Sequence, residues 1–430
     1  MKALMNFLEK YFVPVAARVG AQRHLVAIRD GFVAIMPLMI VGSLAVLVNN
    51  LPIPVFQHFM TAHFSTWKSL GGYIWTGTYA VMAVAVTFSI SYNLARSRDK
   101  DGLAAALLAF VSIIVISQPT ADGGLPLGWL GSQGLFIDIV VALVVTELFC
   151  WLMGNPKLVI KMPEGVPPSV AKSFASLFPG IIIVVIFGIV KFLTVAIGVP
   201  DVYQWVFHVI QAPLMGLSNT LPAAILMVFL ISLLWFFGLH GANIMLPIMT
   251  SLYLPALMSN MQAGVHAHYI FTTSFFDAFV NMGGSGTSLA LLVAIFIASK
   301  SAHYRDLAKM AFAPGIFNIN EPVMFGLPVV LNPMLFIPFI LVPVVLVIIS
   351  WAATAIGLVP HTMILMPWTT PPIIGGMLVT QSIRGGILAL FNFCVAVAIY
   401  LPFIKLGESA KVKAIEAQSE AAHHHATQST

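Results

Sequence analysis

Runs of about 20 apolar residues recur along the whole chain, and each is long enough to cross the roughly 30 Å hydrocarbon core of a bilayer. Charged residues make up 8% of the sequence and apolar residues 59%, whereas soluble domains carry about 25% charged residues. The sequence therefore predicts an all-α polytopic membrane protein. Its net charge of +5 is better explained by basic cytoplasmic loops than by nucleic-acid binding, which we do not expect.

The apolar runs predict about ten transmembrane helices, with both ends of the chain in the cytoplasm. Basic residues follow the second and fourth runs, whereas the segments after the third and fifth runs contain no Lys or Arg. This alternation satisfies the rule that cytoplasmic loops carry the excess of basic residues. The expected spans are 31–49, 72–95, 102–118, 135–153, 174–199, 220–239, 244–260, 286–299, 332–357 and 385–404.

The chain is expected to divide into successive parts. Residues 1–30 interleave basic and apolar side chains, which predicts an amphipathic helix on the inner membrane face. Residues 31–199 form a five-helix half, 200–219 form an interfacial linker helix, and 220–406 form the second half. The polar, alanine-rich tail 407–430 is expected to be disordered.

Two segments, 312–331 and 361–380, do not fit regular spans because both are rich in Pro and Gly. We expect both to be re-entrant hairpins, which enter and leave the membrane on one side. Interrupted segments of this kind are the best indication of a transport site in a sequence. No convincing repeat relates the two halves, so an inverted-repeat transporter is not indicated.

Glu321 lies in the first of these segments, within a strongly apolar stretch that has no other charged residue. A charged side chain at the centre of a transmembrane helix costs roughly 2.5–3.5 kcal/mol on insertion scales. Broken backbone with a carboxylate at membrane depth is tolerated only where it is buried in protein or lines a wet cavity. Asn318 and Asn320 add donors and acceptors for a hydroxyl-rich ligand, so this segment is the first candidate for a substrate site.

Four other ionisable residues lie in or near the apolar runs, and each has a functional and a structural interpretation. His240 follows an aromatic cluster that includes Trp235, and we treat it as a second candidate site residue. Asp138, Glu147 and Asp277 can be functional because burial of an uncompensated charge is expensive, or can instead be paired between helices or reach the interface.

Two further features could contact a polar ligand. The backbone N–H groups of the Gly-Gly-Ser-Gly turn at 283–286 could cradle such a ligand, although tight packing is the simpler explanation. Trp368 offers an aromatic face on which sugar rings stack, with interface anchoring as the alternative. The sequence has no metal-ligand spacing, so no metal site is expected.

The run 315–328, which contains Asn320-Glu321-Pro322, resembles the signature of the membrane component IIC of phosphotransferase systems. It is most similar to the lactose, cellobiose and diacetylchitobiose branch. The segments 29–37, 235–241, 283–286 and 367–368 are similar to that branch as well, and the resemblance extends from about residue 5 to about residue 405.

This resemblance implies a homodimer in the bacterial inner membrane, with residues 31–199 as the dimerisation domain and residues 220–406 as the sugar-transport domain. The second domain would move across the bilayer in an elevator-like way. The sugar would then be phosphorylated by a separate cytoplasmic phosphocysteine subunit, IIB. Phosphoenolpyruvate would supply the phosphoryl group through general phosphocarriers and subunit IIA, with no bound cofactor. Cys150 and Cys394 lie in apolar runs, which fits a donor residue on another chain.

The resemblance also implies roles for individual residues. Glu321 and His240 would hold the hydroxyl that receives the phosphoryl group, and Trp368 would pack against a sugar ring. Whether Glu321 acts as a general base or only orients the hydroxyl stays open. The other implied sugar contacts are Trp235, Asn320, Gly284 and Gln133, the last together with Ser132.

Other functions stay open at this point. A proton- or sodium-coupled sugar symporter could use Asp138, Glu147 or Asp277, and a membrane-embedded enzyme could use His240, Asp277 and Glu321 as acid–base groups. Among substrates, the branch favours cellobiose and diacetylchitobiose over lactose. The sequence does not indicate which membrane face is open at rest.

Overall fold

The computed structural model describes residues 10–11, 13–163, 165–327 and 329–428. All regular secondary structure in these ranges is helical. Seven helical spans among these residues are long and apolar enough to cross a membrane, and one of them, Trp67–Arg96, is formed by α5 and α6 together. Two shorter apolar helices, Gly102–Ile116 and Ser285–Ala298, accompany them. The predicted class, an all-α polytopic membrane protein, is confirmed. The chain forms two compact units, and we describe each by itself.

The N-terminal unit consists of Pro14–Thr220 and Asn243–Thr273. Within it, α6 packs against α3, α7 and α9, and α11 packs against α7 and α9. The helices α7 and α9 match the expected spans within two residues at each end, whereas α3 begins at Arg23, eight residues before the expected start, and the expected span 72–95 is divided between α5 and α6. Its helices are α2 (Val13–Gly20), α3 (Arg23–Asn49), α4 (Pro54–His63), α5 (Trp67–Gly77), α6 (Met82–Arg96), α7 (Gly102–Ile116), α8 (Leu127–Leu130), α9 (Leu135–Leu152), α10 (Pro168–Ala175), α11 (Leu177–Ala196), α12 (Val202–Val206), α13 (Ala212–Ser218) and α15 (Gly241–Ala263).

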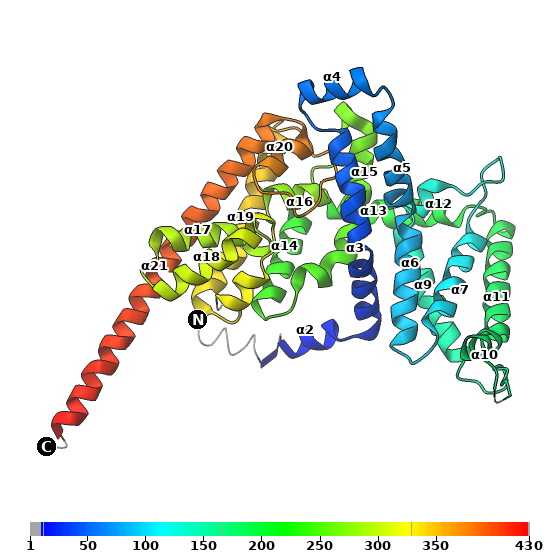
Figure 1. Cartoon of the computed structure of the whole chain (residues 1–430), viewed down its shortest axis with the longest axis horizontal. Coiled ribbons are helices and arrows are strands. Elements are labelled where there is room, and N and C mark those ends of the chain that lie inside the picture. Colours follow the sequence, from blue (N-terminus) through cyan, green and yellow to red (C-terminus); the bar gives the residue numbers. More distant parts are fainter. Residues whose placement is uncertain (1–9, 12, 164, 328, 429–430) are drawn as a thin grey trace. The chain divides into compact units, whose positions relative to one another are not determined.

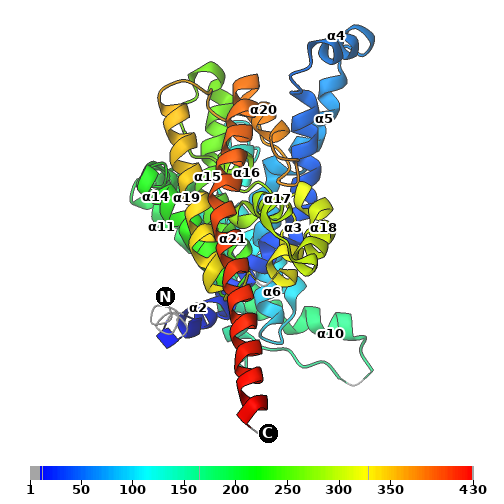
Figure 2. The same ribbon diagram turned by 90° about the vertical axis from the view of Figure 1, so that its left-hand side faces the viewer.

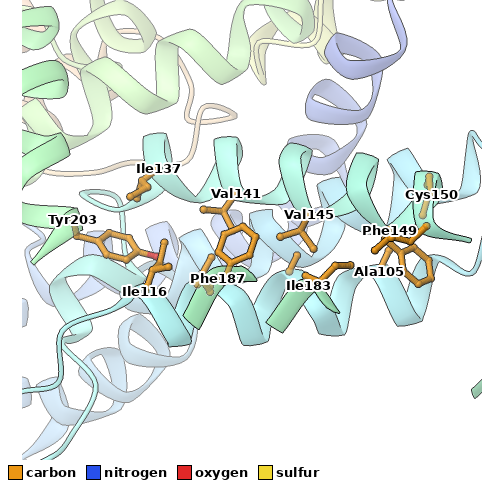
Figure 3. Close-up of a cluster of buried hydrophobic side chains, with 14 residues drawn as sticks. Ala105, Ile116, Ile137, Val141, Val145, Phe149, Cys150, Ile183, Phe187 and Tyr203 are labelled. Carbon is orange, nitrogen blue, oxygen red and sulfur yellow. The ribbon is translucent and has the colours of Figure 1, made fainter. Parts of the chain in front are cut away.

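Small and apolar residues form the core of this unit. A Cβ atom at Gly31 of α3 would lie 2.5 Å from Cγ1 of Ile90 in α6, so glycine permits the close approach of these two helices. Figure 3 shows the neighbouring cluster, in which Val141 and Val145 of α9 lie beside Phe187 and Ile183 of α11. Such a dry contact is the expected basis of helix packing between membrane spans.

The C-terminal unit consists of Leu221–Ala242 and of Ser274 onward, together with the described residues before Pro14. The last helix, α21, packs against α17, α19 and α20, and α14 packs against α19 (Figures 1 and 2). Its helical elements are α14 (Leu221–Phe236), α16 (Thr273–Phe279), η5 (Ser285–Thr287), α17 (Ser288–Ala298), α18 (Ala302–Ile316), η6 (Pro322–Gly326), α19 (Pro333–Ala355), α20 (Ile374–Thr380) and α21 (Ile383–Gln428).

Both predicted hairpin segments contain irregular backbone, as their Pro and Gly content indicates. In the first, α18 ends at Ile316 and a turn leads to a π-helical turn over Pro322–Gly326. In the second, the N–H groups of Met363 and Ile364 donate to the carbonyl of Val379 over 2.8 and 3.2 Å, so the chain folds back on itself. Irregular backbone also separates α16 from α17. The sequence predicts a regular membrane span at 286–299, but in the structure this segment begins inside the 3₁₀ turn η5 (Ser285–Thr287).

The structure divides the second half differently from the expected 220–406 domain. Residues 243–273, with most of α15, belong to the N-terminal unit. The Tyr253 hydroxyl donates to the carbonyl of Ser218 over 3.1 Å, and Asn219 Nδ2 donates to the carbonyl of Phe271 over 2.8 Å. These bonds join α15 and the segment after it to the linker, and hydropathy does not reveal such pairings.

The two ends of the chain also differ from expectation. Of the predicted helix at 1–30, residues 1–9 and 12 lie outside the described residues, and the rest is divided between α2 and the start of α3. The tail 407–430 was expected to be disordered, but α21 continues to Gln428. Ala, Glu, Lys and Gln, which are frequent there, all favour helix over coil.

Candidate functional site

The candidate site of the C-terminal unit contains a pair formed by His240 and Glu321. His240 follows α14 after a turn in which Gly238 has a φ of 77°, and Glu321 precedes the π-helical turn at Pro322. The Nε2 atom of His240 lies 3.4 Å from Oε1 of Glu321. Their side chains are 35% and 46% exposed within the protein, so the carboxylate is half-exposed rather than enclosed. Both groups can therefore contact a ligand.

Trp235 forms the apolar support of this pair. It is 1% exposed, and its ring centroid lies 4.2 Å from that of the His240 ring and 6.2 Å from that of Phe325. The indole therefore limits the orientations that the imidazole can adopt. Phe325 was not a sequence candidate, although it lies four residues after Glu321. The one signal in the sequence is this spacing of four residues, which would place Phe325 on the same face as Glu321 if the segment were helical.

The two asparagines before Glu321 differ in their surroundings. The side-chain amide of Asn318 is bonded to backbone groups of Gly283, Trp368 and Thr370. Asn320 is 5% exposed, and its Nδ2 atom has no hydrogen-bond partner in the described part of the chain. Asn320, which was predicted to bind substrate, therefore keeps donors for a ligand.

Gly284 lies directly against Asn320, with a φ of 94°. A Cβ atom at this position would lie 2.7 Å from Cβ of Asn320, so only glycine fits. The N–H of Gly284 already donates to the carbonyl of Asn281 over 2.8 Å. The structure thus favours the packing interpretation of the Gly-Gly-Ser-Gly turn over a cradle of free N–H groups.

Trp368 lies in irregular backbone between α19 and α20, and it is joined to the Glu321 segment through Asn318. Buried donors without a protein partner include Nε1 of Trp235, Nδ2 of Asn320 and Nε1 of Trp368, as judged over the described residues. A buried donor without a partner costs about 1–3 kcal/mol. A ligand rich in oxygen acceptors would satisfy these donors, and a sugar is such a ligand.

The remaining sequence candidates lie elsewhere. Glu147 accepts from Arg98 over 2.5 Å, lies 2.8 Å from His24 and lies 3.3 Å from Arg23, which is the structural pairing considered above. Asp138 is 0% exposed and accepts a hydrogen bond from the hydroxyl of Tyr203. These residues all belong to the N-terminal unit.

Three further candidates have no contact with the His240–Glu321 pair among the interactions described. Asp277 lies in α16 of the C-terminal unit. Gln133 and Ser132 lie in the turn before α9 of the N-terminal unit. No cluster of three or more His, Cys, Asp or Glu side chains suited to a metal ion occurs within residues 10–11, 13–163, 165–327 and 329–428.

The chain matches the family model "Phosphotransferase system, EIIC" over residues 29–343. It belongs to this family. It is 36% identical to the lichenan permease IIC component of Bacillus subtilis, over 96% of this chain and 95% of that protein. It is 38% identical to the cellobiose-specific EIIC component of Geobacillus stearothermophilus, over 98% of this chain and 97% of that protein.

A solved structure is also similar. The transporter ChbC, the IIC component of the N,N'-diacetylchitobiose-specific phosphotransferase system, superimposes with a TM-score of 0.89. It is 39% identical, over 95% of this chain and 99% of that chain. The resemblance noted in the sequence is therefore confirmed, and this chain is a sugar-specific EIIC of the cellobiose type. Membership of the family disfavours the symporter interpretation and implies an integral protein of a bacterial membrane.

Proposed function

We propose that this EIIC carries a β-linked disaccharide, cellobiose or diacetylchitobiose, into the cell and presents one of its hydroxyl groups to a separate IIB subunit. The observation that carries the proposal is the His240–Glu321 pair, which lies beside Trp235 and is half-exposed. The two sugars are those in the names of the cellobiose-specific relative and of the diacetylchitobiose-specific structure.

The pair suits a hydroxyl group because it combines an acceptor with a group that can donate. The Glu321 carboxylate accepts the O–H of the sugar, and His240 Nε2–H donates to the sugar oxygen. Trp368 supplies an apolar face for a ring, and Asn320 and Trp235 supply the remaining donors. The protein's contribution to phosphorylation is orientation, since it presents one hydroxyl to the incoming phosphoryl group.

In the transfer step, the sugar oxygen attacks phosphorus, a P–O bond forms, and the P–S bond of the phosphocysteine on IIB breaks. The cysteine leaves as a thiolate, and the hydroxyl proton moves to the Glu321 carboxylate or to water. Subunit IIA and the general phosphocarriers restore the phosphocysteine from phosphoenolpyruvate. This chain supplies neither the donor residue nor a bound cofactor.

Translocation requires the site to become accessible from both membrane faces in turn. We infer that the C-terminal unit moves as one body in an elevator-like way while the N-terminal unit forms the homodimer and stays fixed. The division of the chain into two compact units supports this inference. Exposed apolar residues of α11, such as Ile181, Val185 and Ile189, fit lipid or a second copy of the chain. We place both termini in the cytoplasm, as the basic loops indicate.

Calorimetric titration of the purified protein with cellobiose and diacetylchitobiose tests the site. Glu321→Gln and His240→Ala are expected to abolish binding of both sugars while the protein remains folded. Asp306→Asn and His303→Ala are matched controls, because both residues lie exposed on α18 of the same unit and should keep normal affinity. Near-normal affinity in both site variants would remove the assignment.

Uptake of labelled sugar by cells tests the reaction. Label should accumulate as sugar phosphate and only in the presence of the cytoplasmic phosphocarriers. Accumulation of free sugar driven by a proton or sodium gradient would instead identify a symporter.

A further inference from the structure

Irregular segments of the C-terminal unit that are far apart in the sequence meet at the side chain of Asn318, which is 7% exposed. Its Oδ1 atom accepts from the N–H of Gly283 over 2.7 Å. Its Nδ2 atom donates to the carbonyls of Trp368 over 2.6 Å and of Thr370 over 2.9 Å. An amide NH₂ group has two N–H donors, so neither is left for a ligand.

The backbone at this position also favours asparagine. Asn318 has a φ of 62°, in the left-handed region, where Asn is several-fold enriched among residues other than glycine. Its own carbonyl oxygen would lie 2.9 Å from a Cβ atom at Gly284, so the two loops pack closely. The backbone conformation and the side-chain bonds are therefore both satisfied by one residue type.

The groups joined by Asn318 are those that surround the proposed sugar site. Asn320 and Glu321 follow it in the chain, whereas Trp368 lies across the bond to its carbonyl. The segment around Trp368 is irregular, because none of residues 356–373 belongs to a helix. Its position therefore depends on individual hydrogen bonds such as those from Nδ2 of Asn318.

We propose that Asn318 is a positioning residue. Its hydrogen bonds to the carbonyls of Trp368 and Thr370 set the distance from the Trp368 ring to the side chains of Asn320 and Glu321. This inference rests on the proposed sugar site. It assigns different roles to two neighbouring asparagines: Asn320 contacts the sugar, and Asn318 holds the two sides of the site together. Displacing a group of a binding site by about 1 Å can cost a hundredfold in function.

Two substitutions separate the contributions of Asn318. Asn318→Gly keeps the positive φ and removes all the side-chain bonds. Asn318→Asp keeps the acceptor for the N–H of Gly283, but it places a carboxylate oxygen, which cannot donate, against the carbonyls of Trp368 and Thr370. It serves as the second variant if the glycine variant does not fold. Each is expected to lower the affinity for cellobiose about ten- to a hundredfold in calorimetric titration.

Asn260 provides a matched control. It is 0% exposed, and its amide also binds backbone, donating to the carbonyl of Tyr269 and accepting from the N–H groups of His268 and Tyr269. It lies in the N-terminal unit. Asn260→Gly should lower thermal stability and leave the affinity for cellobiose unchanged. If this variant lost as much affinity as the Asn318 variants, the effect at Asn318 would be general destabilisation, and the proposal would be overturned.

A double-mutant cycle with Trp368→Ala tests whether Asn318 acts through Trp368. In the Trp368→Ala background, either Asn318 substitution should change the affinity by no more than about twofold. Losses that add in full, or wild-type affinity in the Asn318 variants, would overturn the proposal. If Glu321→Gln and Trp368→Ala also kept wild-type affinity, the proposed sugar site itself would be wrong. If Glu321→Gln abolished binding and Trp368→Ala weakened it while the Asn318 variants kept wild-type affinity, only the role of Asn318 would fail.

Discussion

The Nε2 atom of His240 lies 3.4 Å from Oε1 of Glu321, although 81 residues separate the two in the chain. The contact brings the end of α14 to the start of the π-helical turn at Pro322. The backbone N–H of Leu331 supports the same junction, because it donates to the carbonyl of Phe236 over 2.9 Å. The pair therefore belongs to a connected substructure rather than to two independent loops.

Glu321→Asp is expected to lower sugar affinity about tenfold or more, because the shorter side chain withdraws the carboxylate from both His240 and the ligand. Because His240→Ala is expected to abolish binding, the cycle uses the milder His240→Gln, and combining it with Glu321→Asp should show a coupling of about 0.5–3 kcal/mol in binding free energy. Calorimetric titration measures both quantities. Strictly additive losses would mean that the two side chains act on the sugar separately.

Gly284→Ala is expected to lower both thermal stability and sugar affinity. The new methyl group would lie 2.7 Å from Cβ of Asn320, at a φ of 94° that L-residues rarely adopt. Gly357 lies in the same unit with a φ of 74°, and a Cβ there meets nothing within 4 Å. Gly357→Ala should therefore lower the free energy of unfolding only by the cost of a left-handed backbone at alanine, about 1–2 kcal/mol, and should keep normal sugar affinity. Equal behaviour of the two variants would show that the contact with Asn320 is unimportant.

Glu147→Gln is expected to lower the free energy of unfolding by about 1–3 kcal/mol and to leave transport activity intact in protein that remains folded. The substitution leaves Arg23, His24 and Arg98 without their shared carboxylate. Thermal unfolding and uptake assays measure the two effects. Asp306→Asn, which breaks the exposed ion pair with Lys309, should change stability by less than about 1 kcal/mol. Loss of uptake without loss of stability would restore a functional role for Glu147.

Tyr203→Phe is expected to destabilise the N-terminal unit by about 1–3 kcal/mol, because Asp138 is fully buried and accepts from the Tyr203 hydroxyl. Combining it with Asp138→Leu should cost less than the sum of the two single changes, since removing both partners leaves no unsatisfied group. Thermal unfolding of the three variants measures this. A fully additive result would place the stabilising partner of Asp138 elsewhere.

The positions of several spans follow from the sequence alone. α7 and α9 begin at Gly102 and Leu135, as predicted, and α19 begins at Pro333, within one residue of the prediction. Hydropathy is a local property, and a run of apolar residues must become a helix in a bilayer whatever its neighbours are. Glu321 and His240 could be chosen for the same reason, because each is a polar group in an apolar surrounding.

Only the tertiary structure decided which groups meet. Asn318 and Asn320 have the same side chain two residues apart, yet the amide of one is bonded to distant backbone while Nδ2 of the other is without a partner in the described chain. The assignment of 243–273 to the N-terminal unit likewise depends on bonds such as that from Tyr253 to Ser218. The physical reason is that a hydrogen bond depends on the position of its partner in space, whereas composition and periodicity report only the neighbours along the chain.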